Sequence, residues 1–131
     1  MGEGLPLSFL VDANILIYHV AGSPVAMEYL ASLIAAKTFN ISVITRIEFL
    51  GWHAQTPEGF EKCQRLVALS QVLPVSEEVA DRAINLRRHK SVKVADAIIA
   101  ATALVNDLKL VTRNPDDFVG KISLEAVNPF Q

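Results

Sequence analysis

The chain has 131 residues, a formal net charge of −2 and a hydrophobic content of 51%. This length suits one domain with a sizeable core, so we expect residues 1–131 to form a single domain. The hydrophobic content excludes a generally disordered chain. The slightly acidic balance gives no overall attraction to nucleic acid, so binding of phosphates would need a local basic patch or a bound cation.

The cysteine content and the apolar runs bear on the cellular compartment. Cys63 is the single cysteine and has no partner for an internal disulfide, which suits a reducing cytosol. The apolar run Ala97–Val105 falls well short of the roughly 18 residues that a membrane span needs. The N-terminus has no basic region typical of a signal peptide. We therefore expect a cytoplasmic protein without membrane contact.

The first half of the chain alternates short apolar runs with helical patterns. The run Leu7–Val11 predicts a buried strand that leads into Asp12, and Ala13–Val20 follows as a helix. Ser23 and Pro24 are typical of a helix start and predict the next helix, Val25–Lys37. The remaining elements of this half are a strand at Asn40–Ile44, a helix from Thr45 to Trp52 and a helix at Glu58–Ser70.

The second half repeats the alternation. Val72–Val75 predicts a short strand at a sheet edge, because Pro74 cannot donate to a ladder. Ser76 caps a helix that runs to about His89. The later predicted elements are a helix that Asp96 opens, through Ala97–Val105, and strands at Leu108–Val111 and Ile122–Val127. This order predicts a three-layer α/β/α sandwich with a mostly parallel sheet of about four to five strands.

Acidic and amide side chains stand where the predicted strands lead into helices. Their positions are Asp12, Glu48, Asp96, Asn114, Asp116 and Asp117. Each can be explained as a helix cap, and Thr45 with Glu48 matches a capping box. Capping does not explain why acids dominate the set, since Ser or Thr would cap as well. In a parallel sheet these positions share one rim, where ligands bind.

Several carboxylates that converge in a partly apolar cleft take up protons or a cation. Oxygen ligands suit Mg²⁺ or Mn²⁺ rather than Zn²⁺, and His19, His53 and His89 are too scattered to form a metal site. A cation of this kind would bind phosphate oxygens and activate water. The pattern therefore predicts phosphodiester hydrolysis.

Basic side chains near these acids are candidate phosphate ligands. They are Arg46, Arg87, Arg88, Lys93 and Arg113. Cations at the end of the helix before Asp96 are also favoured by the helix dipole, so both interpretations stay open.

Four segments of the chain together resemble the PIN-domain family, and most closely its VapC-type toxin ribonucleases. They are FLVDANILIY at Phe9–Tyr18, SVITRIEFL at Ser42–Leu50, VADAIIAATAL from Val94, and LVTRNPDDF at Leu110–Phe118. The resemblance covers essentially the whole chain. It implies a Mg²⁺- or Mn²⁺-dependent endoribonuclease of a toxin–antitoxin pair, which acts on RNA, is inhibited by a cognate antitoxin protein and forms a homodimer.

The resemblance also assigns roles to residues. Asp12 and Asp96 would be the firmest metal ligands, and Glu48 would complete the site directly or through water. The family often has an acid at the position of Asn114, whose carbonyl can still ligate, and Asp117 can supply the missing charge. The two orienting residues would be Thr45 and Thr112.

Two other enzyme or signalling classes fit the sequence less well. A haloacid-dehalogenase-like phosphatase needs an acid two residues after the first, where this chain has Asn14. A receiver-like phosphoacceptor needs paired acids and a late lysine, neither of which is found. The main alternative is a PIN-like module that binds RNA or a partner without cleavage, because Asn114 replaces an acid and the basic patch is modest.

Overall fold

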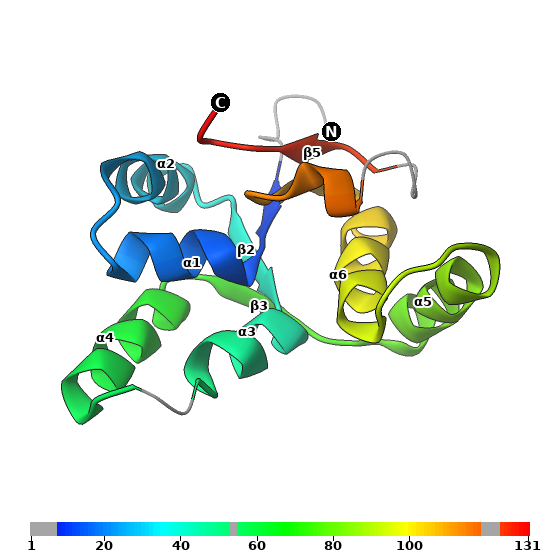
Figure 1. Ribbon diagram of the computed structural model, residues 1–131, viewed down its shortest axis with the longest axis horizontal. Helices are drawn as coiled ribbons and strands as arrows, with labels where there is room; N and C mark the ends of the chain where they lie inside the picture. Colours follow the sequence, from blue (N-terminus) through cyan, green and yellow to red (C-terminus); the bar gives the residue numbers. More distant parts are fainter. Residues whose placement is uncertain (1–7, 53–54, 119–123) are drawn as a thin grey trace.

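The computed structural model describes residues 8–52, 55–118 and 124–131 (Figure 1). In these ranges five strands form one sheet in the order β3-β2-β1-β4-β5, and every neighbouring pair is parallel. The strands are β1 (Phe9–Val11), β2 (Phe39–Ser42), β3 (Gln71–Leu73), β4 (Lys109–Val111) and β5 (Ala126–Val127). The predicted parallel sheet and the edge position of β3 are confirmed.

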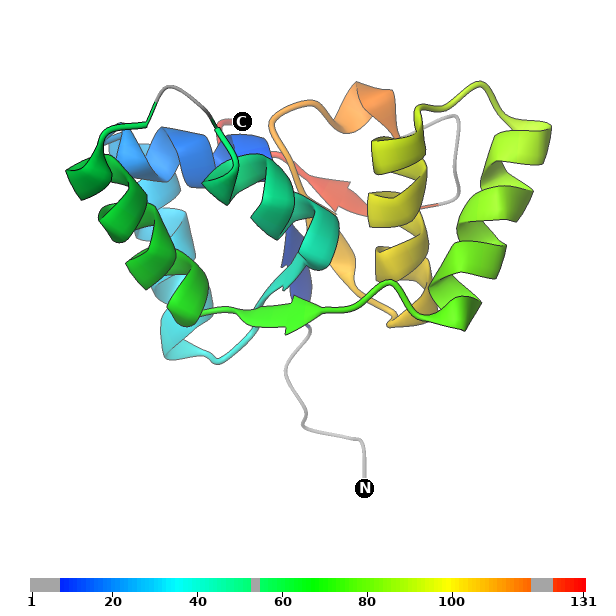
Figure 2. The ribbon, with the colours of Figure 1, turned by 90° about the horizontal axis from the view of Figure 1, so that it is seen from below.

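Helices cover both faces of the sheet, as Figure 2 shows. They are α1 (Ala13–Val20), α2 (Pro24–Ala35), α3 (Val43–Leu50), α4 (Pro57–Ala68), α5 (Glu77–His89) and α6 (Val94–Val105). The first four pack together on one face, while α5 and α6 form a pair on the other. This arrangement confirms the predicted three-layer α/β/α sandwich.

The core lies on both sides of the central strand. On one side, Val11 of β1 packs in a cluster with residues of α1 to α4, and Cys63 belongs to it with 5% of its surface exposed. On the other side, Leu10 packs against Ile99 and Ala100 of α6. Half of the residues of α6 are buried, so this apolar helix holds a fixed position beside β1 and β4.

The start of α3 differs from the prediction. Strand β2 ends at Ser42, whose Oγ accepts a hydrogen bond from the Ile44 amide at 3.1 Å and caps the helix. Thr45 is therefore inside the first turn and is fully buried, with no hydrogen-bond partner for its Oγ1 among the described residues. The predicted capping box was wrong, and Glu48 lies in the second turn of α3 rather than at its start.

The start of α6 also differs. The helix begins at Val94 with Lys93 in the N-cap position, which makes no side-chain capping bond. Asp96 thus lies in the first turn and does not open the helix as a cap. Its charge there still complements the helix dipole.

Two other features complete the comparison. The predicted last strand began at residue 122, which lies outside the described residues, and β5 covers Ala126–Val127. Within the parts of the chain that the structure describes, every helix is too short or too polar to span a bilayer.

Candidate active site

The order in which successive strands are added to the sheet reverses at β1. From β1 it passes to β2 and β3 on one side, and later returns to β4 on the other side of β1. In open parallel sheets the crevice outside the strand ends at such a reversal is where ligands bind. Asp12 follows β1 and Thr112 follows β4, so these two residues border this crevice.

The Asp12 carboxylate is held by three groups. Its Oδ1 accepts a hydrogen bond from the Ala13 amide at 2.8 Å, which caps α1. Its Oδ2 accepts from Thr112 Oγ1 at 2.9 Å and from Asn14 Nδ2 at 3.4 Å. These bonds join two segments that are far apart in the sequence and fix the direction in which the carboxylate points.

Thr112 links Asp12 to the segment after β4. The buried Thr112 hydroxyl donates to Asp12 and accepts a hydrogen bond from the Asn114 amide at 3.1 Å. Asn114 precedes the short 3-10 turn η1 (Pro115–Asp117), but its side chain makes no capping bond there. The expectation that Asn114 caps this turn was wrong, while the placement of Thr112 beside Asp12 agrees with an orienting role.

The charges of neighbouring acids act on Asp12 and Glu48 at this rim. Burial raises the pKa of Asp12, against the hydrogen bonds from Thr112 and Ala13, and the charges of Asp96 and Asp117 raise it further. Burial also raises the pKa of Glu48, with added contributions from Asp12 and Asp96. Because α3 packs against α6, acids from separate parts of the chain meet at one place.

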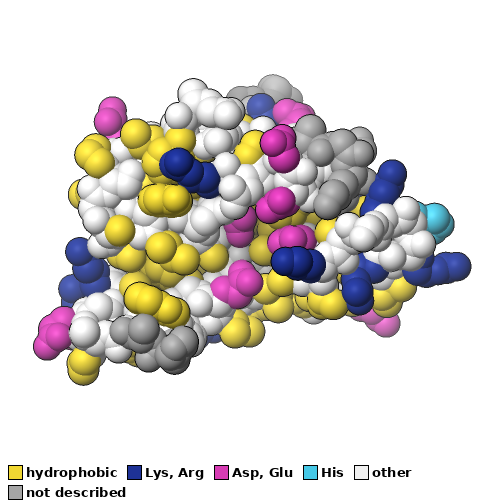
Figure 3. All heavy atoms as spheres, in the orientation of Figure 1, with side chains coloured by type: hydrophobic (Ala, Val, Ile, Leu, Met, Phe, Trp, Pro, Cys, Tyr) yellow, Lys and Arg dark blue, Asp and Glu magenta, His cyan; other side chains and the backbone are white. Residues whose placement is uncertain are grey.

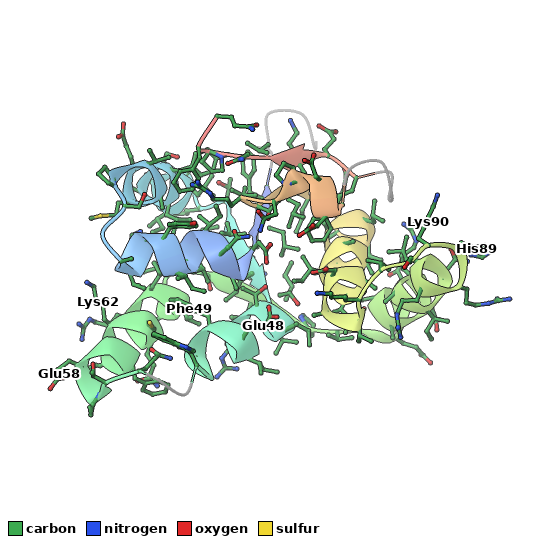
Figure 4. All side chains as sticks on the ribbon, viewed as in Figure 1. Glu48, Phe49, Glu58, Lys62, His89 and Lys90 are labelled. Carbon is green, nitrogen blue, oxygen red and sulfur yellow. The ribbon has the colours of Figure 1, made fainter. Side chains whose placement is uncertain are left out.

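The figures show the same gathering of acids. Asp and Glu side chains collect in the middle of the face seen in Figure 3, with Lys and Arg side chains to the right of them. In Figure 4 the Glu48 side chain lies on the part of α3 that is turned toward the space between α1 and α6, whereas His89 and Lys90 lie at the far end of α5.

The arrangement of the oxygen donors decides which metal they fit. Among the described residues, no group of three or more His, Cys, Asp or Glu side chains is close enough to enclose an ion. This argues against a closed site of the structural zinc type. Mg²⁺ usually keeps several waters and is bound through one or two carboxylates and substrate phosphates, so an open set of carboxylates fits it.

A cavity of about 410 Å³ opens beside the acids. It is lined by Arg87, Ser91, Val92, Lys93, Asp96 and Asp117. The structure thus brings two of the predicted phosphate ligands, Arg87 and Lys93, next to two of the predicted acids. Cations and acids in one cavity suit a phosphate that is bound together with a metal.

The other predicted phosphate ligands lie elsewhere. Arg88 and Arg46 are exposed and do not line this cavity. The Arg113 guanidinium packs over the rings of Phe130 and Tyr18, with its Cζ 4.1 and 4.9 Å from their centroids.

Sequence reasoning missed two contributors to the site. Asn14 was used only to exclude a phosphatase, yet its amide contacts Asp12 and Thr112. Its position two residues after Asp12, at a helix start, was a usable signal. Ser91 lines the cavity, and nothing in its sequence context marks it.

Comparison with known proteins gives the family. The PIN domain model matches residues 9–120. Ribonuclease VapC10 from Mycobacterium tuberculosis is 37% identical over 110 residues, which cover 80% of this chain and 81% of that protein. The residues matched by the family model include Asp12, Glu48 and Asp96.

Solved structures agree with this assignment. A chain of the toxin-antitoxin complex from Klebsiella pneumoniae is 30% identical and has a TM-score of 0.79, with 95% of this chain and 99% of that chain covered. DNA-bound VapBC from Salmonella typhimurium, with 21% identity, a TM-score of 0.78 and coverage of 95% and 99%, shares the fold. The chain belongs to the PIN-domain family and, within it, to the VapC-type ribonuclease toxins of type II toxin–antitoxin systems.

Proposed function

We propose that this ribonuclease is a Mg²⁺- or Mn²⁺-dependent endoribonuclease whose active site is built from Asp12, Glu48 and Asp96, with Asp117 beside them. The observation that carries the proposal is the geometry of the rim: Thr112 holds the Asp12 carboxylate by a 2.9 Å hydrogen bond where β1 and β4 end, and Asp96 and Asp117 line one cavity. Like charges that are held together in a folded protein take up a proton or a compensating cation.

Asp12 and Asp96 are the proposed direct ligands, and Glu48 acts directly or through a water. Asn114 offers a neutral oxygen and Asp117 an additional charge, so the number of ions held depends on these two. When bound, the cation supplies Lewis acidity toward phosphate oxygens and lowers the pKa of a coordinated water.

The protein's own groups position the substrate. Thr112 holds the Asp12 carboxylate by a 2.9 Å hydrogen bond, so that carboxylate does not need to reorient during the reaction. Arg87 and Lys93 bind the flanking phosphates in the cavity beside Asp96. The carboxylates orient the attacking water in line with the leaving oxygen.

A cognate antitoxin and a second copy of the chain are the proposed protein partners. A second cavity of about 520 Å³ lies between α1, α3 and α4, beside Glu48. Its lining includes Ile17, Phe49 and Trp52, and 60% of the Trp52 surface is exposed. An apolar surface of this kind next to the acids suits an antitoxin segment that blocks access to the site. The homodimer rests on the family resemblance.

The experiment is cleavage of labelled RNA by the purified protein in Mg²⁺, in Mn²⁺ and in EDTA. Products that depend on the metal are expected. Equal cleavage in EDTA would contradict the metal role, and RNA binding without products would favour the module that binds without cutting. Adding the cognate antitoxin should suppress the products.

A further inference from the structure

A cluster formed by Tyr18, Arg113 and Phe130 has no role in the site described above. The rings of Tyr18 and Phe130 lie 5.1 Å apart at an interplanar angle of 57°. The Arg113 guanidinium lies over both, 4.1 Å from the Phe130 centroid and 4.9 Å from the Tyr18 centroid. Cation–π attraction holds the guanidinium group against the rings.

Hydrogen bonds connect this cluster to the acids. The Arg113 amide donates to Asn14 Oδ1 at 3.2 Å, and Asn14 Nδ2 donates to Asp12 Oδ2 at 3.4 Å. The Arg113 carbonyl accepts from Asn128 Nδ2 at 3.1 Å, and Asn128 Oδ1 accepts from the Phe130 amide at 2.9 Å. Asn14 and Asn128 therefore hold the backbone of Arg113 from two sides. Asn14 also contacts Asp12, so it connects the cluster directly to the acids.

The cluster remains accessible. Arg113 is exposed, and 38% of the Tyr18 surface is exposed. Among the described residues, no carboxylate forms an ion pair with Arg113. A positive, planar and prearranged group beside an RNA-cleaving site is the kind of surface on which unpaired bases stack.

We propose that Arg113, supported by Tyr18 and Phe130, is the stacking site for one unpaired nucleobase next to the scissile phosphate of the RNA substrate. This inference rests on the proposed ribonuclease function and names a part of its substrate recognition. It differs from the sequence-based expectation for Arg113, because a phosphate contact requires only charge and stacking requires the guanidinium plane.

The test pairs a protein change with an RNA change. A labelled single-stranded oligoribonucleotide that the wild-type protein cuts in Mn²⁺ is selected from a randomised pool, and single abasic sites are introduced along it. Arg113→Lys keeps the charge and removes the plane. We expect it to raise KM about tenfold, the order of one lost base stack, with kcat little changed. On RNA that is abasic at the stacked position, wild type and variant should have equal KM.

Two further variants complete the test. Phe130→Ala removes the support of the guanidinium and should give the same pattern as Arg113→Lys. Phe60→Ala is the matched control, because Phe60 is a partly exposed phenylalanine on α4 with 39% of its surface exposed. It should leave KM unchanged on every RNA. Melting curves confirm that all variants are folded.

Several outcomes would overturn the inference. If Arg113→Lys had the same KM as the wild type on all RNAs, RNA recognition would use only the charge of this side chain. An increase that persists unchanged on every abasic RNA would exclude stacking. Loss of antitoxin binding or of self-association in Phe130→Ala, without a change in KM, would make the cluster a protein interface. Absence of any metal-dependent product from the wild type would instead contradict the proposed function.

Discussion

The carboxylate of Asp12 accepts hydrogen bonds at both oxygens, and its pKa is nevertheless raised. Burial and the charges of Asp96 and Asp117 outweigh the bonds from Thr112 and Ala13. A raised folded-state pKa means that the folded protein binds more protons than the unfolded chain in the window above the ordinary value of 3.8. The free energy of unfolding then falls as the pH rises through that window.

The decrease in the free energy of unfolding with rising pH leads to a prediction for Asp12→Asn. Without metal, at neutral pH, the variant should have a higher Tm than the wild type, because it lacks the cost of the buried charge. The difference should shrink as the pH is lowered, because the raised pKa lets the wild-type carboxyl take up its proton and become neutral. Thermal melts in EDTA across this range measure it. A lower Tm for the variant at every pH would show that the charge is compensated within the protein.

Asp96→Asn should abolish cleavage while leaving the fold intact. We expect a loss of at least about 100-fold in kcat/KM, because even residues that only support a metal ligand contribute about 10- to 100-fold, with Tm nearly unchanged. Asp116→Asn is the control, since Asp116 is an exposed acid in η1 outside the cavity lining and should retain activity. Persistent cleavage by Asp96→Asn would make the proposed metal role wrong.

At the scale of single elements, the start of α3 decides where Glu48 lies. Ser42 caps this helix and Thr45 is buried with an unpartnered hydroxyl, the reverse of what the capping box predicted. The ladder between β2 and β3 pairs Ser42 with Leu73, so the strand must end there. The position of a cap depends on this distant pairing, which local sequence does not contain.

Loss of the side-chain hydroxyl should change the free energy of unfolding differently at Ser42 and at Thr45. Ser42→Ala removes the cap and should lower the free energy of unfolding by about 1 kcal/mol. Thr45→Val keeps the shape and removes an unsatisfied polar group, so it should be neutral or stabilising. Denaturant unfolding of both variants gives the comparison. A larger loss for Thr45→Val would restore the predicted capping box.

Most elements followed from the sequence, because buried strands read as continuous apolar runs and Ser23 and Ser76 capped the helices that they preceded. The approach of Asp12 to the segment after β4 also followed, since the carboxyl ends of parallel strands share a rim. The contact of Tyr18 with Phe130 did not, because it depends on the path of the last segment over α1. No periodicity in the sequence indicates the path of this segment.

At the scale of the whole molecule, an acidic protein must bind an anionic polymer. With a net charge of −2, affinity for RNA has to come from local cations such as Arg87 and Lys93 together with the metal. The proposed phosphate contacts therefore predict a specific dependence on salt.

In an Asp96→Asn background, which does not consume the RNA, replacing Arg87 and Lys93 by Ala should weaken binding. It should also flatten the plot of log affinity against log salt by about 1.4, or about 0.7 per lost contact with a single strand. Replacing Lys62 and Arg65 of α4 by Ala changes the net charge equally and should leave the slope unchanged. Equal slopes for both double variants would show that only the global charge matters.

The acids that meet at the rim come from α3, α6 and the residues after β1 and β4, so a bound cation would link elements from both halves of the chain. A ligand that binds only the folded state stabilises it, by about 2.7 kcal/mol at a concentration about 100 times Kd. Mg²⁺ should therefore raise the wild-type Tm by several degrees. Asp12→Asn and Asp96→Asn should lose this increase.

Salt alone also screens repulsion between carboxylates, so NaCl at matched ionic strength is the necessary control. If NaCl reproduced the whole Mg²⁺ effect, the rim would be a cluster of repelling charges without a specific ion. If Mg²⁺ stabilised the wild type beyond NaCl and neither variant responded, the same carboxylates would account for both the raised pKa values and the cation. Stability, measured without any RNA, would then report on the site separately from catalysis.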